Sequence, residues 1–251
     1  MKKYLSVFYL TARHSFYKII ALMTLSGIVQ YLLFQKELTA LLNSDISSLT
    51  GYRDIERVIS LSAINIVFAV TVAAVIFLLS VTAVAFGSEC NYTVNRLSVS
   101  ESVYFTLQSF YNFLVLIFIL GFEIVLTYIF TQKYIESANV CFVSNQSVFL
   151  AYYRNEFLHS ILPLSDILIW IRNAMQIFTL SLAASFFSYK QRRGKRSIAV
   201  IFLTIFSIIW NSGNVGGDLT VIITYILCVC MSAYIIVYVK NGWGEQNEYV
   251  D

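Results

Sequence analysis

The chain has 251 residues, of which 58% are hydrophobic and only 12% charged, with a formal net charge of +3. A soluble domain carries about a quarter charged residues, so this composition excludes an ordinary soluble protein and predicts an all-α integral membrane protein. The cations gather at the ends of apolar runs rather than along one face, which excludes a surface that follows a nucleic-acid backbone.

The first 17 residues predict an amphipathic helix at the membrane surface. Apolar and aromatic side chains recur there at helical spacing on one face: Leu5, Phe8, Tyr9, Ala12 and Phe16. We expect residues 2–17 to lie in the inner headgroup layer, ahead of a first span at about 18–34. The alternative is that these residues simply extend the first span into water.

Five further apolar runs are long enough to predict membrane spans. They lie at about 61–86, 103–130, 164–187, 197–210 and 219–239. The longest connection, 131–162, is expected outside the cell and carries aromatic residues at helical spacing in its later part. We therefore expect it to hold a helix on the outer membrane surface.

The orientation is predicted from a basic cluster in the segment 189–196. This segment holds five Lys and Arg residues between two apolar runs, and such clusters resist translocation. With the cluster inside, both termini are cytoplasmic. Of the 17 Lys and Arg residues, eleven then fall inside, five outside and one, Arg172, within a span. The sequence thus predicts a multi-pass protein of the cell membrane.

Two ionisable residues, Glu123 and Arg172, lie well inside predicted spans. At about 1.5 Å per residue they fall at similar depth on antiparallel helices, so we expect them to pair across the bundle. Asn65, Asn173 and Gln176 fall near the same level and would complete a polar patch. The patch would either line a substrate path or hold a buried salt bridge that fixes helix register.

The sequence predicts no catalytic or metal site. Gly194-Lys195 is followed by Arg196 and has no glycine five positions before Gly194, so a nucleotide-binding P-loop is missing. The two histidines, His14 and His159, fall on opposite predicted sides of the membrane and cannot share a metal. We therefore expect no enzyme and no cofactor bound by this chain.

Short motifs accompany this layout. They are Asn95-Arg96-Leu97-Ser98-Val99-Ser100 before the third span, His159-Ser160-Ile161-Leu162-Pro163-Leu164, Trp170, Arg172-Asn173 and Tyr189-Lys190-Gln191-Arg192-Arg193-Gly194-Lys195. With the six spans and the N-terminal helix, the chain resembles the permease subunits of ATP-binding cassette (ABC) transporters of the second exporter type, particularly the small bacterial six-span subunits.

The resemblance implies a permease that pairs with a second permease, identical or related, and with ABC ATPase subunits that bind ATP and Mg. It would move a hydrophobic or amphipathic substrate (lipid, peptide or drug-like) outward across a bacterial plasma membrane. The implied ATPase-coupling residues lie between spans two and three, with one on the N-terminal helix: Glu89, Asn95, Arg96, Glu101 and Arg13. The alternative for this loop is a simple turn.

Two other functions remain open from the sequence. One is a membrane assembly or accessory protein that transports nothing. The other is a small ion-coupled secondary transporter, whose activity would depend on Glu123.

Overall fold

The computed structural model describes residues 2–43, 55–81, 100–137, 145–192, 198, 200–205 and 218–247. Across these residues the ordered elements are helices joined by short turns, without strands. They are α1 (Lys2–Asn43), α2 (Ile55–Leu61), α3 (Ile64–Val81), α5 (Glu101–Ser137), α6 (Asn145–Arg154), α7 (Glu156–Ile161), α8 (Ile167–Arg192) and α10 (Asp218–Asn247).

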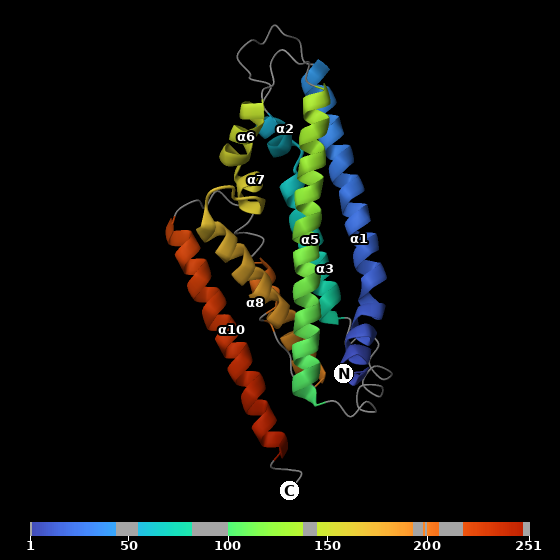
Figure 1. The fold of residues 1–251 in the computed structure, drawn as a ribbon, viewed down its shortest axis with the longest axis vertical. Coiled ribbons are helices and arrows are strands. Elements are labelled where there is room, and N and C mark those ends of the chain that lie inside the picture. Colours follow the sequence, from blue (N-terminus) through green and yellow to red (C-terminus); the bar gives the residue numbers. More distant parts are fainter. Residues whose placement is uncertain are drawn as a thin grey trace.

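Five of these helices, α1, α3, α5, α8 and α10, are long and apolar enough to cross a membrane. They run lengthwise through the molecule, and the first residues of α1 lie toward the same end as the last residues of α10 (Figure 1). In the described part of the chain α5 packs against α1 and α8, α3 packs against α1 and α8, and α10 packs mainly on α8. The short helices α2, α6 and α7 lie toward the opposite end (Figure 1).

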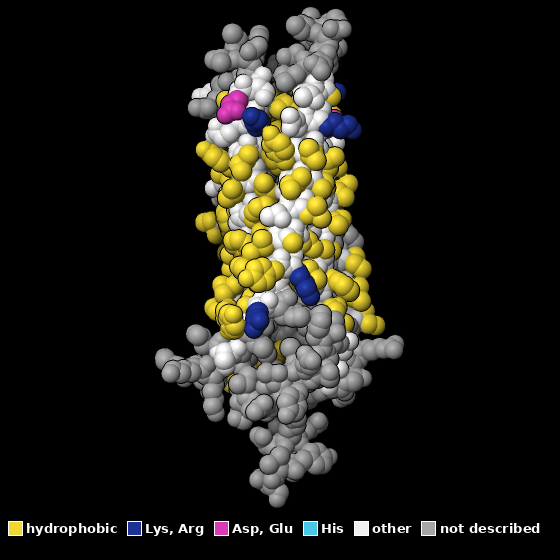
Figure 2. Space-filling view, turned by 90° about the vertical axis from the view of Figure 1, so that its right-hand side faces the viewer, with side chains coloured by type: hydrophobic (Ala, Val, Ile, Leu, Met, Phe, Trp, Pro, Cys, Tyr) yellow, Lys and Arg dark blue, Asp and Glu magenta, His cyan; other side chains and the backbone are white. Residues whose placement is uncertain are grey.

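The outside of the bundle is apolar along its middle. Figure 2 shows one face on which hydrophobic side chains cover the middle, while Lys and Arg side chains lie toward both ends of the coloured part and acidic side chains toward the upper end. Large side chains such as Ile28, Phe118 and Ile226 are more than half exposed. Lipid tails are as apolar as these side chains, so a bilayer accepts this surface, and the protein is a multi-pass helical membrane protein.

The N-terminal segment is not a separate interfacial helix, because α1 runs without a break from Lys2 to Asn43. Its first turns pack along α5. The hydroxyl groups of Ser15 and Tyr111 lie 2.7 Å apart, and the Phe8 ring meets the Tyr111 ring edge-on at 5.7 Å. These contacts hold the segment against α5, so that residues 2–17 continue the helix of the first span. At about 1.5 Å per residue α1 is about 63 Å long, so it extends beyond a roughly 30 Å hydrocarbon core.

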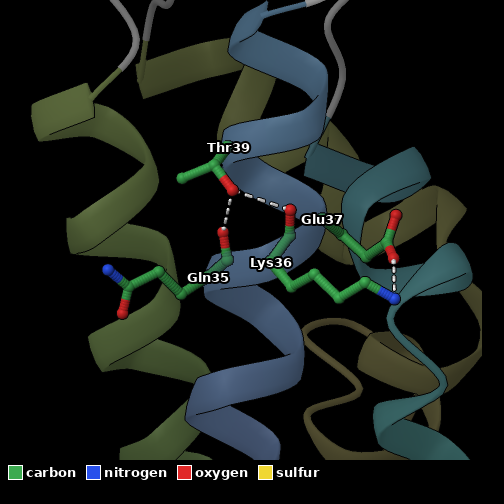
Figure 3. A network of polar contacts seen from close by, with 4 residues as sticks. All are labelled: Gln35, Lys36, Glu37 and Thr39. Atoms are coloured by element: carbon green, nitrogen blue, oxygen red, sulfur yellow. Dashed lines mark hydrogen bonds and ion pairs between the residues drawn. The ribbon is translucent and has the colours of Figure 1, made fainter.

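The end of the apolar part of α1 is marked by polar contacts. The exposed Lys36 and the partly buried Glu37 form an ion pair of 3.9 Å. The Thr39 hydroxyl donates to the carbonyl oxygens of Gln35 at 3.0 Å and Lys36 at 2.9 Å (Figure 3). The expected first span ended at residue 34, and the helix itself continues to Asn43. A helix can leave the bilayer without ending, because its backbone remains hydrogen-bonded in water.

The expected second span, 61–86, begins with a turn. α2 ends at Leu61, and α3 begins at Ile64 after Ala63, whose φ of 53° is positive. Few non-glycine residues adopt this conformation, so the chain changes direction sharply between the two helices. α3 then runs to Val81.

The later part of the expected external connection forms two helices, α6 and α7. Asn155 caps α7, since its side-chain oxygen accepts hydrogen bonds from the backbone nitrogens of Phe157 and Leu158, at 3.1 Å each. Buried residues of both helices join a cluster that contains the stacked rings of Phe34 and Phe130. α6 also carries an exposed apolar surface, formed by Phe149, Leu150 and Tyr153.

The last three expected spans differ in how much of them the structure describes. The expected spans 164–187 and 219–239 correspond to α8 and α10, each of which extends further at its C-terminal end. Of the expected span 197–210, only 198 and 200–205 are described, and 200–205 are helical. The remaining residues of that span lie outside the described part of the chain.

Candidate functional site

A partly open cavity of about 70 Å³ lies among α3, α5, α7 and α8. It is several times larger than the roughly 10–15 Å³ that one water molecule needs. Most of its lining is apolar, and a few polar residues gather on one side. The lining residues are Phe68, Val72, Leu116, Ile119, Leu120, Ser160, Ile161, Asn173, Gln176, Ile177 and Leu180.

The polar side of this cavity is built by one turn of α8 and the end of α7. Asn173 donates from its side-chain nitrogen to the backbone oxygen of Ser160 at 2.7 Å. Its side-chain oxygen accepts from the Arg172 guanidinium, at 3.2 Å from Nη2 and 3.4 Å from Nε. Gln176 lines the same cavity, and its buried side-chain nitrogen has no hydrogen-bond partner in the described residues. This unpartnered donor could serve a bound acceptor group.

The expected ion pair between Glu123 and Arg172 is not formed. Both residues are buried, at 2% and 7% exposed. Glu123 accepts a hydrogen bond from Gln30 of α1, over 3.2 Å from Nε2 to Oε2, whereas Arg172 contacts its own neighbour Asn173. The two side chains therefore have different partners, Glu123 on α1 and Arg172 on its own helix α8.

The expected polar patch is brought together only in part. Arg172, Asn173 and Gln176 are neighbours on α8, and the last two line the cavity. Asn65 stands in the first turn of α3, where its side-chain oxygen accepts from the backbone nitrogen of Ile66 at 2.9 Å. Asn65 and Glu123 are not among the residues that line the cavity.

Sequence reasoning missed a second set of buried polar groups, between α5 and α8. Asn112 donates to Ser185 Oγ at 3.0 Å, and Ser185 donates to the carbonyl oxygen of Ser181 at 3.1 Å. Gln108 lies one turn before Asn112 and is also buried. The signal was available in the sequence, since polar residues four apart within an apolar run often mark a helix–helix contact. Gln30, the partner of Glu123, was also missed, although Ser26 lies four residues before it in the same apolar run and both are buried.

Most of the expected ATPase-coupling residues lie outside the described part of the chain. Glu89, Asn95 and Arg96 fall in the undescribed segment between α3 and α5. Glu101 is in the first turn of α5, and Arg13 is exposed on α1. The starts of these two helices lie toward the same end of the molecule (Figure 1).

Aromatic rings hold two cations of the basic cluster at that end. The Arg192 guanidinium of α8 lies over the Tyr104 ring of α5, at 4.4 Å from its centre. The Lys190 nitrogen lies 4.7 Å from the Phe186 ring centre and 4.6 Å from that of Tyr238 on α10. These cation–π contacts connect the end of α8 to both neighbouring helices.

The described residues contain no group of three or more His, Cys, Asp or Glu side chains that could hold a metal ion. Comparison with known proteins identified no matching family, no matching curated protein and no matching solved structure.

Proposed function

We propose that the chain is the membrane-spanning permease subunit of an ABC transporter, exporting a hydrophobic or amphipathic substrate with ATP hydrolysed by a separate subunit. The observation that carries the proposal is the cavity within the spans, which combines apolar walls with the polar groups of Asn173 and Gln176. A lining of this kind suits a molecule with an apolar body and a hydrogen-bonding head.

The size of the cavity limits what it holds. At about 70 Å³ it is smaller than the roughly 300–1,000 Å³ of pockets for drug-sized ligands. In this conformation it accepts one chain or one head of an amphipathic molecule. Movement of α3 or α7 relative to α5 and α8 would enlarge it, which is the motion that alternating exposure requires.

The proposed coupling follows from the chain order. The segment 82–99 follows α3 and precedes α5 in the chain, and both helices contribute residues to the cavity wall. A partner ATPase that binds this segment would move two walls of the cavity at once. In the proposal, Arg96 and Glu101 make that contact and Arg13 supports it from α1.

The test is affinity purification of the tagged protein from its native host in mild detergent, with mass spectrometry of the bound proteins. We expect a P-loop protein in near-stoichiometric amount, retained by Arg57→Glu on the opposite predicted side and lost on Arg96→Glu. A folded protein that elutes as a single species without any P-loop partner would overturn the proposal.

An ion-coupled secondary transporter is the second candidate. It is favoured by one observation, the buried Glu123 that no described cation pairs with. A transporter of this kind would work without the ATPase, so reconstitution of the purified chain alone into vesicles separates the two candidates. Uptake driven by an ion gradient in those vesicles would favour the second.

A further inference from the structure

The side chains of Gln30 and Glu123 form a contact that is closed off from solvent, between α1 and α5. The amide nitrogen of Gln30 donates to Oε2 of Glu123 over 3.2 Å. Gln30 is 0% exposed and Glu123 is 2% exposed. Within the described residues each of the two side chains has the other as its hydrogen-bond partner. The nearest buried polar residues along the two helices, Ser26 of α1 and Thr127 of α5, donate instead to backbone oxygens of their own helices.

Each side chain also carries an oxygen atom without a partner. Oε1 of Gln30 and Oε1 of Glu123 are buried and have no hydrogen-bond partner within the described residues. Both atoms are acceptors when Glu123 is ionised, so neither can satisfy the other. Exchanging the nitrogen and oxygen of the Gln30 amide does not help, because it would place the amide oxygen against the carboxylate.

No cation of the neighbouring helices neutralises Glu123. Among the ionisable residues of α1, Tyr31 is the nearest along the helix to Gln30, and Lys36 lies beyond it in the ion pair with Glu37. α3 contains no ionisable residue. On α8 the Arg172 guanidinium bonds to Asn173. The ion pairs of the described residues do not include Glu123.

We propose that Glu123 is a proton-binding site shared with Gln30. One proton on Oε1 of Glu123 removes the charge and turns that oxygen into a donor for Oε1 of Gln30. The existing N–H bond and this new O–H bond together close the ring of a carboxylic acid–amide pair, which satisfies both unpartnered oxygens at once. A bound metal cation fits less well, because hard cations take roughly six or more oxygen ligands and only two oxygens are free here.

The site joins α1 to α5, so its proton has a structural consequence. Loss of the proton would leave a carboxylate facing an amide oxygen in a water-free contact and would favour separation of the two helices at this level. Proton binding would then bias the packing of α1 on α5. Proton binding at this site does not require a partner ATPase.

The experiment is infrared spectroscopy of the purified full chain in lipid nanodiscs at neutral pH. The spectrum of Glu123→Gln is subtracted from that of the wild type, and Glu136→Gln serves as the control, because Glu136 is an exposed carboxylate next to Lys133. Glu123→Gln keeps the shape and the hydrogen-bonding capacity of the protonated acid, so we expect it to fold.

We expect the difference spectrum to contain the carbonyl band of an un-ionised carboxylic acid, and the control to show only ionised carboxylate bands. Gln30→Leu should shift the acid band in the direction of a weaker hydrogen bond. A difference spectrum with ionised carboxylate bands for Glu123 would overturn the proposal. An acid band that is unchanged in folded Gln30→Leu would overturn the sharing with Gln30.

Discussion

Asn112 of α5 donates its side-chain hydrogen bond to Ser185 of α8 over 3.0 Å, and both residues are at most 1% exposed. The Ser185 hydroxyl in turn donates a hydrogen bond to the carbonyl oxygen of Ser181. Small Ser and Ala side chains let α8 approach α5 closely, and the amide then finds a partner that lipid cannot offer. This contact fixes how α5 and α8 are rotated against each other along the cavity wall.

Removing either partner of this bond should loosen the bundle. We expect Asn112→Leu and Ser185→Ala each to destabilise the protein, with a coupling energy between the two changes of about 0.6 kcal/mol and at most about 1.7 kcal/mol, as is typical of hydrogen bonds between membrane helices. The measurement is denaturant unfolding in detergent, with the double variant completing a cycle. Leu114→Ala, at a lipid-facing position of α5, is the control. Strict additivity of the two single changes would contradict the contact.

Lys190 should stabilise the packing of α8 on α10. Its ammonium lies against Phe186 and Tyr238, so Lys190→Gln removes a cation–π contact worth about 0.5–1 kcal/mol when partly exposed. Lys190→Arg should keep most of the stability, and Lys240→Gln, an exposed cation on α10, should change little. Thermal unfolding in detergent measures all three. If Lys240→Gln lowers the unfolding temperature as much as Lys190→Gln does, the change in net charge, and not the cation–π contact, explains the effect.

The approximate positions of the five long apolar helices could be predicted because apolar runs of about 20 residues have few other uses in a protein. Their ends could not, since a helix that leaves the bilayer is still hydrogen-bonded and its ending depends on the chain beyond. α1 therefore continues to Asn43 and α5 to Ser137, past residues 34 and 130 where the apolar runs stop. The N-terminal part of α1 contacts Tyr111 of α5, which lies far away in the sequence.

The burial of Glu123 and Arg172 could be predicted from the sequence, but the partners of their side chains could not. Counting residues along antiparallel helices places Glu123 and Arg172 at one level, and the structure buries both. Which helix each side chain faces depends on how the helices are turned, and a single polar residue in an apolar run does not reveal that. Gln30 was not predicted as part of the site, whereas Asn173 and Gln176 were, because they fall near the same level as Glu123 and Arg172.

The pair of Ser15 and Tyr111 should determine whether the N-terminal turns of α1 follow α5. Their hydroxyls are 2.7 Å apart and Ser15 is 1% exposed. We expect Tyr111→Phe to lower the free energy of unfolding by about 0.5–1.5 kcal/mol, because the buried Ser15 hydroxyl loses its partner across the helices. Tyr128→Phe, at an exposed position of the same helix, is the control. Equal stability of the two variants would favour a segment that leaves α5 and lies on the membrane surface.

Two glycines within the spans should respond differently to alanine. A Cβ atom at Gly121 of α5 meets nothing within 4 Å, whereas one at Gly27 of α1 would lie 3.1 Å from the Cζ atom of Phe122. Alanine in a helix interior is favoured over glycine by about 0.5–1 kcal/mol. We therefore expect Gly121→Ala to gain most of this stability in an unfolding titration.

In Gly27→Ala the gain in helix stability is offset by a steric cost. The new methyl group forces the Phe122 ring to move by a few tenths of an ångström at the contact between α1 and α5. Phe122 is half-buried, so part of that movement is available, and we expect Gly27→Ala to be less stable than Gly121→Ala but still folded. The double variant Gly27→Ala with Phe122→Leu, compared with Phe122→Leu alone, should recover the missing gain, because the shorter side chain leaves room for the new methyl group. If Gly27→Ala matches Gly121→Ala without that second change, α1 and α5 are further apart than in this structure.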